Sequence, residues 1–263
     1  DEEHSLGVLE TYKKLIKIMR LPAMKKFSLF LLTMSIGFSA CDAISWLKLV
    51  RAGLDREKFA MATTITIPVK LLLLLFFSKR MTGEKSMDIF MKIYPFRLAF
   101  NLVVPVFVWA TPKMLTGHDV PLYFYGLLIF VYGCPQMSSD FMVANRLAFC
   151  ARTSDPAMGS TYMTLMTTLK NLSTDCVNSL VLLLVDPLTF SQCSTDAENT
   201  CCDSKQVKEC AGECVAYVDG YYVLIGVCTV VGLIWLKWAI PTIRELQKKD
   251  PKEWKVSSER QQK

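Results

Sequence analysis

Histidine is nearly absent from this chain of 263 residues, and so are the short motifs that mark many enzymes and ATP-driven motors. The two histidines, His4 and His118, lie outside every long apolar block. The sequence contains no glycine-rich P-loop, no HExxH zinc motif and no GxSxG nucleophile turn. These absences argue against a membrane enzyme and against an ATP-driven pump on this chain. We therefore expect no enzyme activity, no metal and no cofactor.

No signal peptide is expected from the residues at the start of this sequence, because no basic segment is followed by a short apolar stretch there. It begins Asp1-Glu2-Glu3, without an initiator methionine. We expect either a fragment or a chain from which an upstream segment has been removed.

What the sequence does contain is a large share of hydrophobic residues, 52%, gathered into long blocks. The apolar core of a bilayer is about 30 Å thick, so a spanning helix needs about 20 mostly apolar residues. Lipid offers no hydrogen-bond partners to the backbone, so such blocks must be helical. The sequence predicts an all-α membrane protein with six transmembrane helices, over residues 27–49, 59–77, 89–110, 120–143, 158–185 and 221–240.

The basic residues predict the orientation of these spans. Lys and Arg concentrate before the first block, after the second and fourth blocks, and in the tail, with Arg146 and Arg152 in the loop after the fourth. The positive-inside rule then places both termini in the cytosol. Because this topology accounts for the net charge of +6, we expect the lipid bilayer as a partner and no nucleic acid.

The sequence divides into three parts around the spans. Residues 1–26 are cytosolic and include an amphipathic stretch at 8–20, which is either a helix lying along the membrane surface or a linker helix. The spans fill 27–240, and 241–263 form a basic cytosolic tail. A cysteine-rich loop at 186–218 falls on the non-cytosolic side, where disulfides persist. The disulfide candidates are Cys193, Cys201, Cys210 and Cys214; their pairing stays open, and a zinc site is the weaker alternative.

Charged and polar residues inside the predicted spans are the main functional signal. Ionisable groups at bilayer depth cost several kcal/mol and usually face a partner or a water-filled cavity. They are Asp42, Lys70, Arg97, Asp140, Lys170 and Asp175, with Tyr132, Gln136 and Asn171 on the same polar stripes. One interpretation is a path between helices, in which the cations attract an anion and the carboxylates serve coupling or gating. The other is a set of ion pairs that only fix helix packing.

Several stretches are specific enough to indicate a family. GFSACDAISWLKLVRAGL at 37–54, YPFRL at 94–98, WATPKM at 109–114, SDPAMGSTYMTL at 154–165, VDPLT at 185–189 and DGYYV at 219–223 resemble the acetyl-coenzyme A transporter family of the major facilitator superfamily. The spacing of the four cysteines named above is similar to that of the family's lumenal loop. After Asn171-Leu172 the chain departs from the family pattern, with Ser173-Thr174-Asp175-Cys176.

The resemblance implies a carrier of two six-helix halves, of which this chain is the C-terminal half, preceded by the end of a central cytosolic loop. It implies an endoplasmic reticulum membrane location and proton-coupled movement of acetyl-CoA from cytosol to lumen, with the N-terminal half as partner. Arg97, Lys170 and Lys70 would then contact phosphates, and Asp42 and Asp175 would serve coupling or gating. The alternatives are a carrier for another bulky anion, such as oxidised glutathione, and a non-transporting scaffold that works through its cysteine-rich loop.

Overall fold

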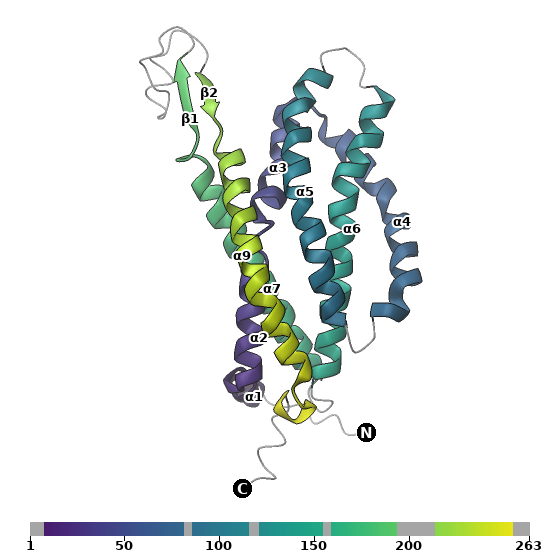
Figure 1. Ribbon diagram of the computed structural model, residues 1–263, viewed down its shortest axis with the longest axis vertical. Coiled ribbons are helices and arrows are strands. Elements are labelled where there is room, and N and C mark those ends of the chain that lie inside the picture. The colour runs from purple at the N-terminus through teal and green to yellow at the C-terminus, as the bar shows by residue number, and fades with distance from the viewer. Residues whose placement is uncertain (1–7, 82–85, 116–120, 155–158, 194–213, 255–263) are drawn as a thin grey trace.

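The computed structural model describes residues 8–81, 86–115, 121–154, 159–193 and 214–254, and it is almost entirely helical (Figure 1). The long helices run roughly along one axis. Helix α1 and the end of α9 lie at one end of the bundle, and two short strands lie at the other. The elements are α1 (Val8–Arg20), α2 (Pro22–Thr33), α3 (Ser39–Arg51), α4 (Arg56–Met81), α5 (Ser86–Met114), α6 (Leu122–Thr153), α7 (Gly159–Val185), β1 (Phe190–Cys193), β2 (Cys214–Val218), α9 (Gly220–Lys248) and the 3-10 helix η2 (Pro251–Trp254).

Four helices within the described ranges are long and apolar enough to cross a membrane: Arg56–Phe77 of α4, and α5, α6 and α9. Their outward faces carry large apolar side chains, such as Leu72 of α4, which is 68% exposed. A soluble protein would bury most of these groups, whereas lipid accepts them. The prediction of a helical membrane protein is therefore confirmed. The count of six spans and the major facilitator arrangement stay predictions.

The first predicted span, residues 27–49, is not one continuous helix. Helix α2 ends at Thr33 and α3 begins at Ser39, and Gly37 lies in the break. Neighbouring helices satisfy the backbone carbonyls freed there: Asn101 Nδ2 donates to the Gly37 carbonyl at 2.5 Å and Ser173 Oγ donates to the Leu32 carbonyl at 2.6 Å. Lipid could not supply these bonds, so side chains from α5 and α7 make the break possible.

Helix α6 extends further than the sequence analysis predicted, which places Arg146 and Arg152 inside a helix rather than in a loop. With 32 residues it is about 48 Å long at 1.5 Å per residue, well beyond the thickness of the apolar core. A spanning helix need not end where its apolar block ends, and the basic residues that follow such a block can be helical too. Likewise α9 continues to Lys248.

The bundle holds two clusters of buried apolar side chains, one toward each end. The cluster near α1 and η2 is rich in aromatic rings, with ring contacts among α2, α5 and α9. Trp254 of η2 is 1% exposed, lies against Phe27 and Phe149, and accepts a hydrogen bond at its carbonyl from Tyr162 Oη at 2.8 Å. These contacts hold the described start of the tail against α2, α6 and α7.

Two short strands depart from the all-helical prediction. β1 and β2 pair antiparallel beyond the ends of α7 and α9, in a register that places Cys193 opposite Cys214. The other two disulfide candidates, Cys201 and Cys210, lie outside the described residues.

Candidate functional site

A polar cavity of about 370 Å³ lies among α3, α5 and α6, with one residue from α4. Four of the predicted site residues contribute to its wall: Asp42, Arg97, Tyr132 and Gln136. The remaining lining residues are Cys41, Trp46, Phe59, Phe100, Asn101, Val104, Pro135 and Ser139. Three long helices thus direct polar side chains toward one space, which is the arrangement of a small-molecule site within a helical bundle.

The central feature of the cavity is an ion pair between Arg97 and Asp42. Arg97 Nη2 donates to Asp42 Oδ2 at 2.6 Å, and the guanidinium carbon lies 4.3 Å from the centre of the Phe38 ring. The side chain of Arg97 is 13% exposed and that of Asp42 is 48% exposed. The sequence predicts separate roles for these two residues, whereas the structure pairs them.

The helix break sets the position of Asp42. Asp42 lies in the first turn of α3, where the backbone N–H groups favour a carboxylate. Asn101, which bonds to the carbonyl of Gly37 in the break, lies one turn beyond Arg97 on α5. The same stretch of α5 therefore fixes the break and presents the arginine to the carboxylate.

A second ion pair lies beside the first cavity. Lys70 Nζ of α4 is 3.4 Å from Asp140 Oδ2 of α6, and Gln136 Nε2 donates to Asp140 Oδ1 at 3.4 Å. Lys70 lines a hollow of about 220 Å³ that shares Phe59, Tyr132 and Gln136 with the main cavity. Because of these shared walls the two hollows adjoin, and Lys70 points to Asp140 rather than toward the membrane surface.

The three predicted residues on α7 lie apart from both hollows. Asn171 and Asp175 are exposed, and Lys170 is half-buried. Lys170 is within electrostatic range of Arg97, Asp42, Asp175 and Arg146. It therefore belongs to the same charged region without lining the cavity.

Arg146 is a buried charged residue outside the predicted site. The sequence predicts a loop at this position, but Arg146 lies in α6 and is only 3% exposed. Its Nε and Nη1 atoms have no hydrogen-bond partner among the described residues. The signal that could have found it is its spacing of seven residues from Ser139, which places the two residues on one face of a helix.

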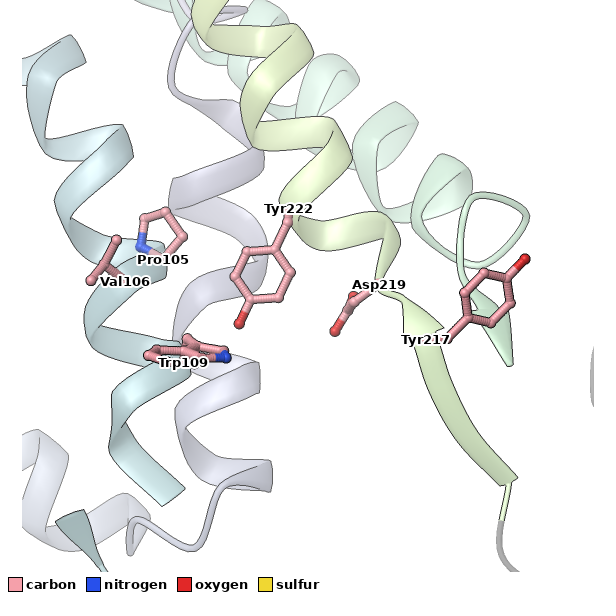
Figure 2. Close-up of a pocket in the computed structure, with 6 residues that line it drawn as sticks. All are labelled: Pro105, Val106, Trp109, Tyr217, Asp219 and Tyr222. Carbon is pink, nitrogen blue, oxygen red and sulfur yellow. The ribbon is translucent and has the colours of Figure 1, made fainter. Parts of the chain in front are cut away.

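A third hollow, of about 610 Å³, lies elsewhere, between α5 and the start of α9 (Figure 2). Figure 2 shows Tyr222 between Trp109 and Asp219, with Tyr217 turned away from them. Lys48 donates to the one carboxylate there, Asp219, which also caps α9 at Tyr221 N. Aromatic rings with few charges are typical of the membrane interface rather than of an anion site. Among the described residues, no three His, Cys, Asp or Glu side chains come together as a metal site requires.

Apolar helices long enough to span a membrane, a break in the first predicted span and ion pairs beside a cavity define a helical membrane protein with charged groups between its helices. A family model described as "Acetyl-coenzyme A transporter 1" matches residues 1–117 and 95–256. The chain therefore belongs to the acetyl-coenzyme A transporter family.

Two curated relatives come from yeasts. The chain is 29% identical over 231 residues to an uncharacterised protein of Schizosaccharomyces pombe, covering 85% of the chain and 43% of the relative. It is 22% identical over 264 residues to an uncharacterised membrane protein of Saccharomyces cerevisiae, covering 88% of the chain and 47% of the relative. The chain thus spans less than half the length of these relatives. No solved structure matches it.

Proposed function

We propose that this chain is one half of a carrier that moves acetyl-CoA across a membrane by alternating access. Membership of the acetyl-coenzyme A transporter family supports the cargo. The coverage of the relatives supports a second half, since each extends to about twice the matched length. Carriers built from two halves bind their cargo near the middle of the bilayer, where the halves meet. Ligand pockets typically enclose about 300–1,000 Å³, and this cavity of about 370 Å³ lies at the small end of that range. An opposing wall from the second half would enlarge the cavity to suit a large nucleotide.

The observation that carries the proposal is the Arg97–Asp42 pair on the cavity wall. A guanidinium forms strong bidentate bonds with phosphate oxygens, and coenzyme A esters carry phosphates. A phosphate and Asp42 would compete for the same donors on Arg97. Protonation of Asp42 would weaken its hold on Arg97 and so favour the cargo. This competition is a physical route to proton coupling, and we propose it for transport from the cytosol into the lumen of the endoplasmic reticulum.

The other predicted residues fit around this exchange. Lys70 and Asp140 form the second pair, and its opening and closing would gate the adjoining hollow. Asn171 and Asp175 are exposed on α7, and we propose that they face the N-terminal half. With both termini of the segment in the cytosol, the β1–β2 end would lie in the lumen, the oxidising side that suits the disulfide candidates.

Uptake of labelled acetyl-CoA into proteoliposomes containing the full-length protein tests the proposal. Arg97→Ala should lower uptake by about tenfold or more, the equivalent of losing one hydrogen bond to a charged group. The matched control is Lys26→Ala, which removes an exposed ion pair with Glu245 (2.6 Å) far from the cavity and should leave uptake unchanged. Equal uptake by Arg97→Ala and the unmodified protein would remove Arg97 from the site.

The same assay separates the other functions. If excess oxidised glutathione competes with acetyl-CoA more strongly than unlabelled acetyl-CoA does, the cargo is the other anion. A scaffold would lose its function when residues 191–216 are deleted and keep it when Arg97 and Lys70 are neutralised. The proposed carrier should lose uptake when Arg97 and Lys70 are neutralised.

A further inference from the structure

Arg146 is a buried cation without a visible counter-charge. It is 3% exposed, and none of the ion pairs formed within the described ranges includes it. Its buried neighbours along α6 are Met142, Phe149, Cys150 and the neutral Asn145, so none of them carries a negative charge. A guanidinium in such surroundings is strongly unfavourable unless an anion meets it, because burial removes its hydration.

The position of Arg146 relates it to the cavity. Ser139 lines the cavity, and Arg146 follows it by seven residues on the same helix. Seven residues are two turns, so Arg146 lies on the same face of α6, about 10 Å beyond Ser139 toward the α1 end of the bundle. The residue therefore lies beneath the cavity, on the wall that continues from it.

The charges of this region do not balance. Lys170 of α7 is within electrostatic range of Arg146 and Arg97, and the carboxylates in its range are Asp42 and Asp175. Asp42 already pairs with Arg97, and Asp175 is exposed. Lys170 appears in none of the ion pairs of the described residues. Arg146 and Lys170 are thus two cations on adjoining helices, and neither forms an ion pair among the described residues.

We propose that Arg146 and Lys170 form a phosphate subsite at the α1 end of the cavity, which is filled when the bundle opens toward that end. This inference rests on the proposed carrier function. Two nitrogens of Arg146 without partners, together with one ammonium, suit the several oxygens of a phosphate better than the two oxygens of one carboxylate. In the arrangement described here Arg146 is 3% exposed and therefore has almost no contact with water.

Competition for acetyl-CoA uptake by the full-length carrier tests the subsite. The two competitors are coenzyme A and pantetheine, which has the thiol arm but no phosphate. Coenzyme A should inhibit the unmodified carrier far more strongly than pantetheine does. Arg146→Gln should weaken inhibition by coenzyme A about tenfold or more and leave inhibition by pantetheine unchanged. The inhibition of Arg146→Lys by coenzyme A should be intermediate between that of the unmodified carrier and that of Arg146→Gln.

The matched control is Arg152→Gln, an exposed arginine in the last turn of the same helix, which should behave as the unmodified carrier does. If Arg146→Gln does not fold, Lys170→Gln replaces it, because Lys170 is only half-buried. A folded variant of either kind with coenzyme A inhibition within twofold of the unmodified carrier overturns the subsite and points to a protein carboxylate as the partner. Absence of acetyl-CoA uptake by the unmodified carrier would instead defeat the proposed function.

Discussion

At the scale of single residues, the guanidinium of Arg97 contacts a carboxylate and an aromatic ring at the same time. Its guanidinium donates to Asp42 and lies over the ring of Phe38, in a cavity that also presents Tyr132 and Gln136. A salt bridge in such a place contributes little net stability, because the desolvation of both charges offsets their attraction. The pair is better suited to exchange, since a phosphate could take the place of the carboxylate without leaving Arg97 unpaired.

Asp42→Asn tests this exchange. Asparagine keeps the shape of aspartate but has no carboxyl group to bind and release a proton, so uptake should no longer respond to an imposed proton gradient. Binding of acetyl-CoA should persist, because the competitor of the phosphate has been weakened. The measurement is uptake by the full-length carrier with and without a pH difference across the vesicle membrane. A gradient response equal to that of the unmodified protein would assign the coupling to another residue.

At the scale of helices, the break between α2 and α3 depends on a close crossing with α9. A Cβ added at Gly232 would lie 2.9 Å from Leu98 Cδ1 and 3.1 Å from Gly37 Cα. Gly37 is equally confined, because its own Cβ would lie 2.7 Å from Tyr94 Oη. Glycine at both positions lets the two backbones approach, as small residues do between membrane helices.

Gly232→Ala should therefore destabilise the protein by about 1–3 kcal/mol through overpacking. The melting temperature of the full-length protein in detergent measures the effect. The control is Gly226→Ala on the same helix, where an added Cβ meets nothing within 4 Å and alanine favours the helix. The crossing would be looser than described if Gly232→Ala melted at the same temperature as Gly226→Ala.

The helices also show what a sequence can and cannot predict. Periodicity could bring Tyr132 and Gln136 to one face of a helix, because they are four residues apart. It could not show that Arg97 pairs with Asp42, which depends on how α5 packs on α3. The break at 34–38 interrupts an apolar run without a proline, and the carbonyls it frees are met by side chains more than 60 residues away. Arg146 was misplaced for a related reason, since a basic residue after an apolar block resembles a loop until the helix length is known.

At the scale of the whole molecule, side chains of α3, α5 and α6 line a cavity, to which the proposed N-terminal half would add the opposing wall. The apolar outer faces of the chain suit lipid, the pairs Arg97–Asp42 and Lys70–Asp140 lie between helices, and the chain spans less than half the length of the curated relatives it matches. The proposed carrier requires that water reach the charges at bilayer depth through a gap between the helices. Without that gap, the ion pairs would only fix packing and the carrier assignment would rest on family membership.

Thiol labelling of the full-length carrier, in a background without other cysteines, tests this claim most directly. Ser139→Cys places a thiol on the cavity wall, and Leu72→Cys places one on the lipid-facing side of α4 as the control. A charged thiol reagent requires water and an ionised thiol, so it should modify Cys at 139 but not at 72, and acetyl-CoA should protect position 139. Failure of the reagent to modify position 139 from either side of the membrane, with or without acetyl-CoA, would contradict the account.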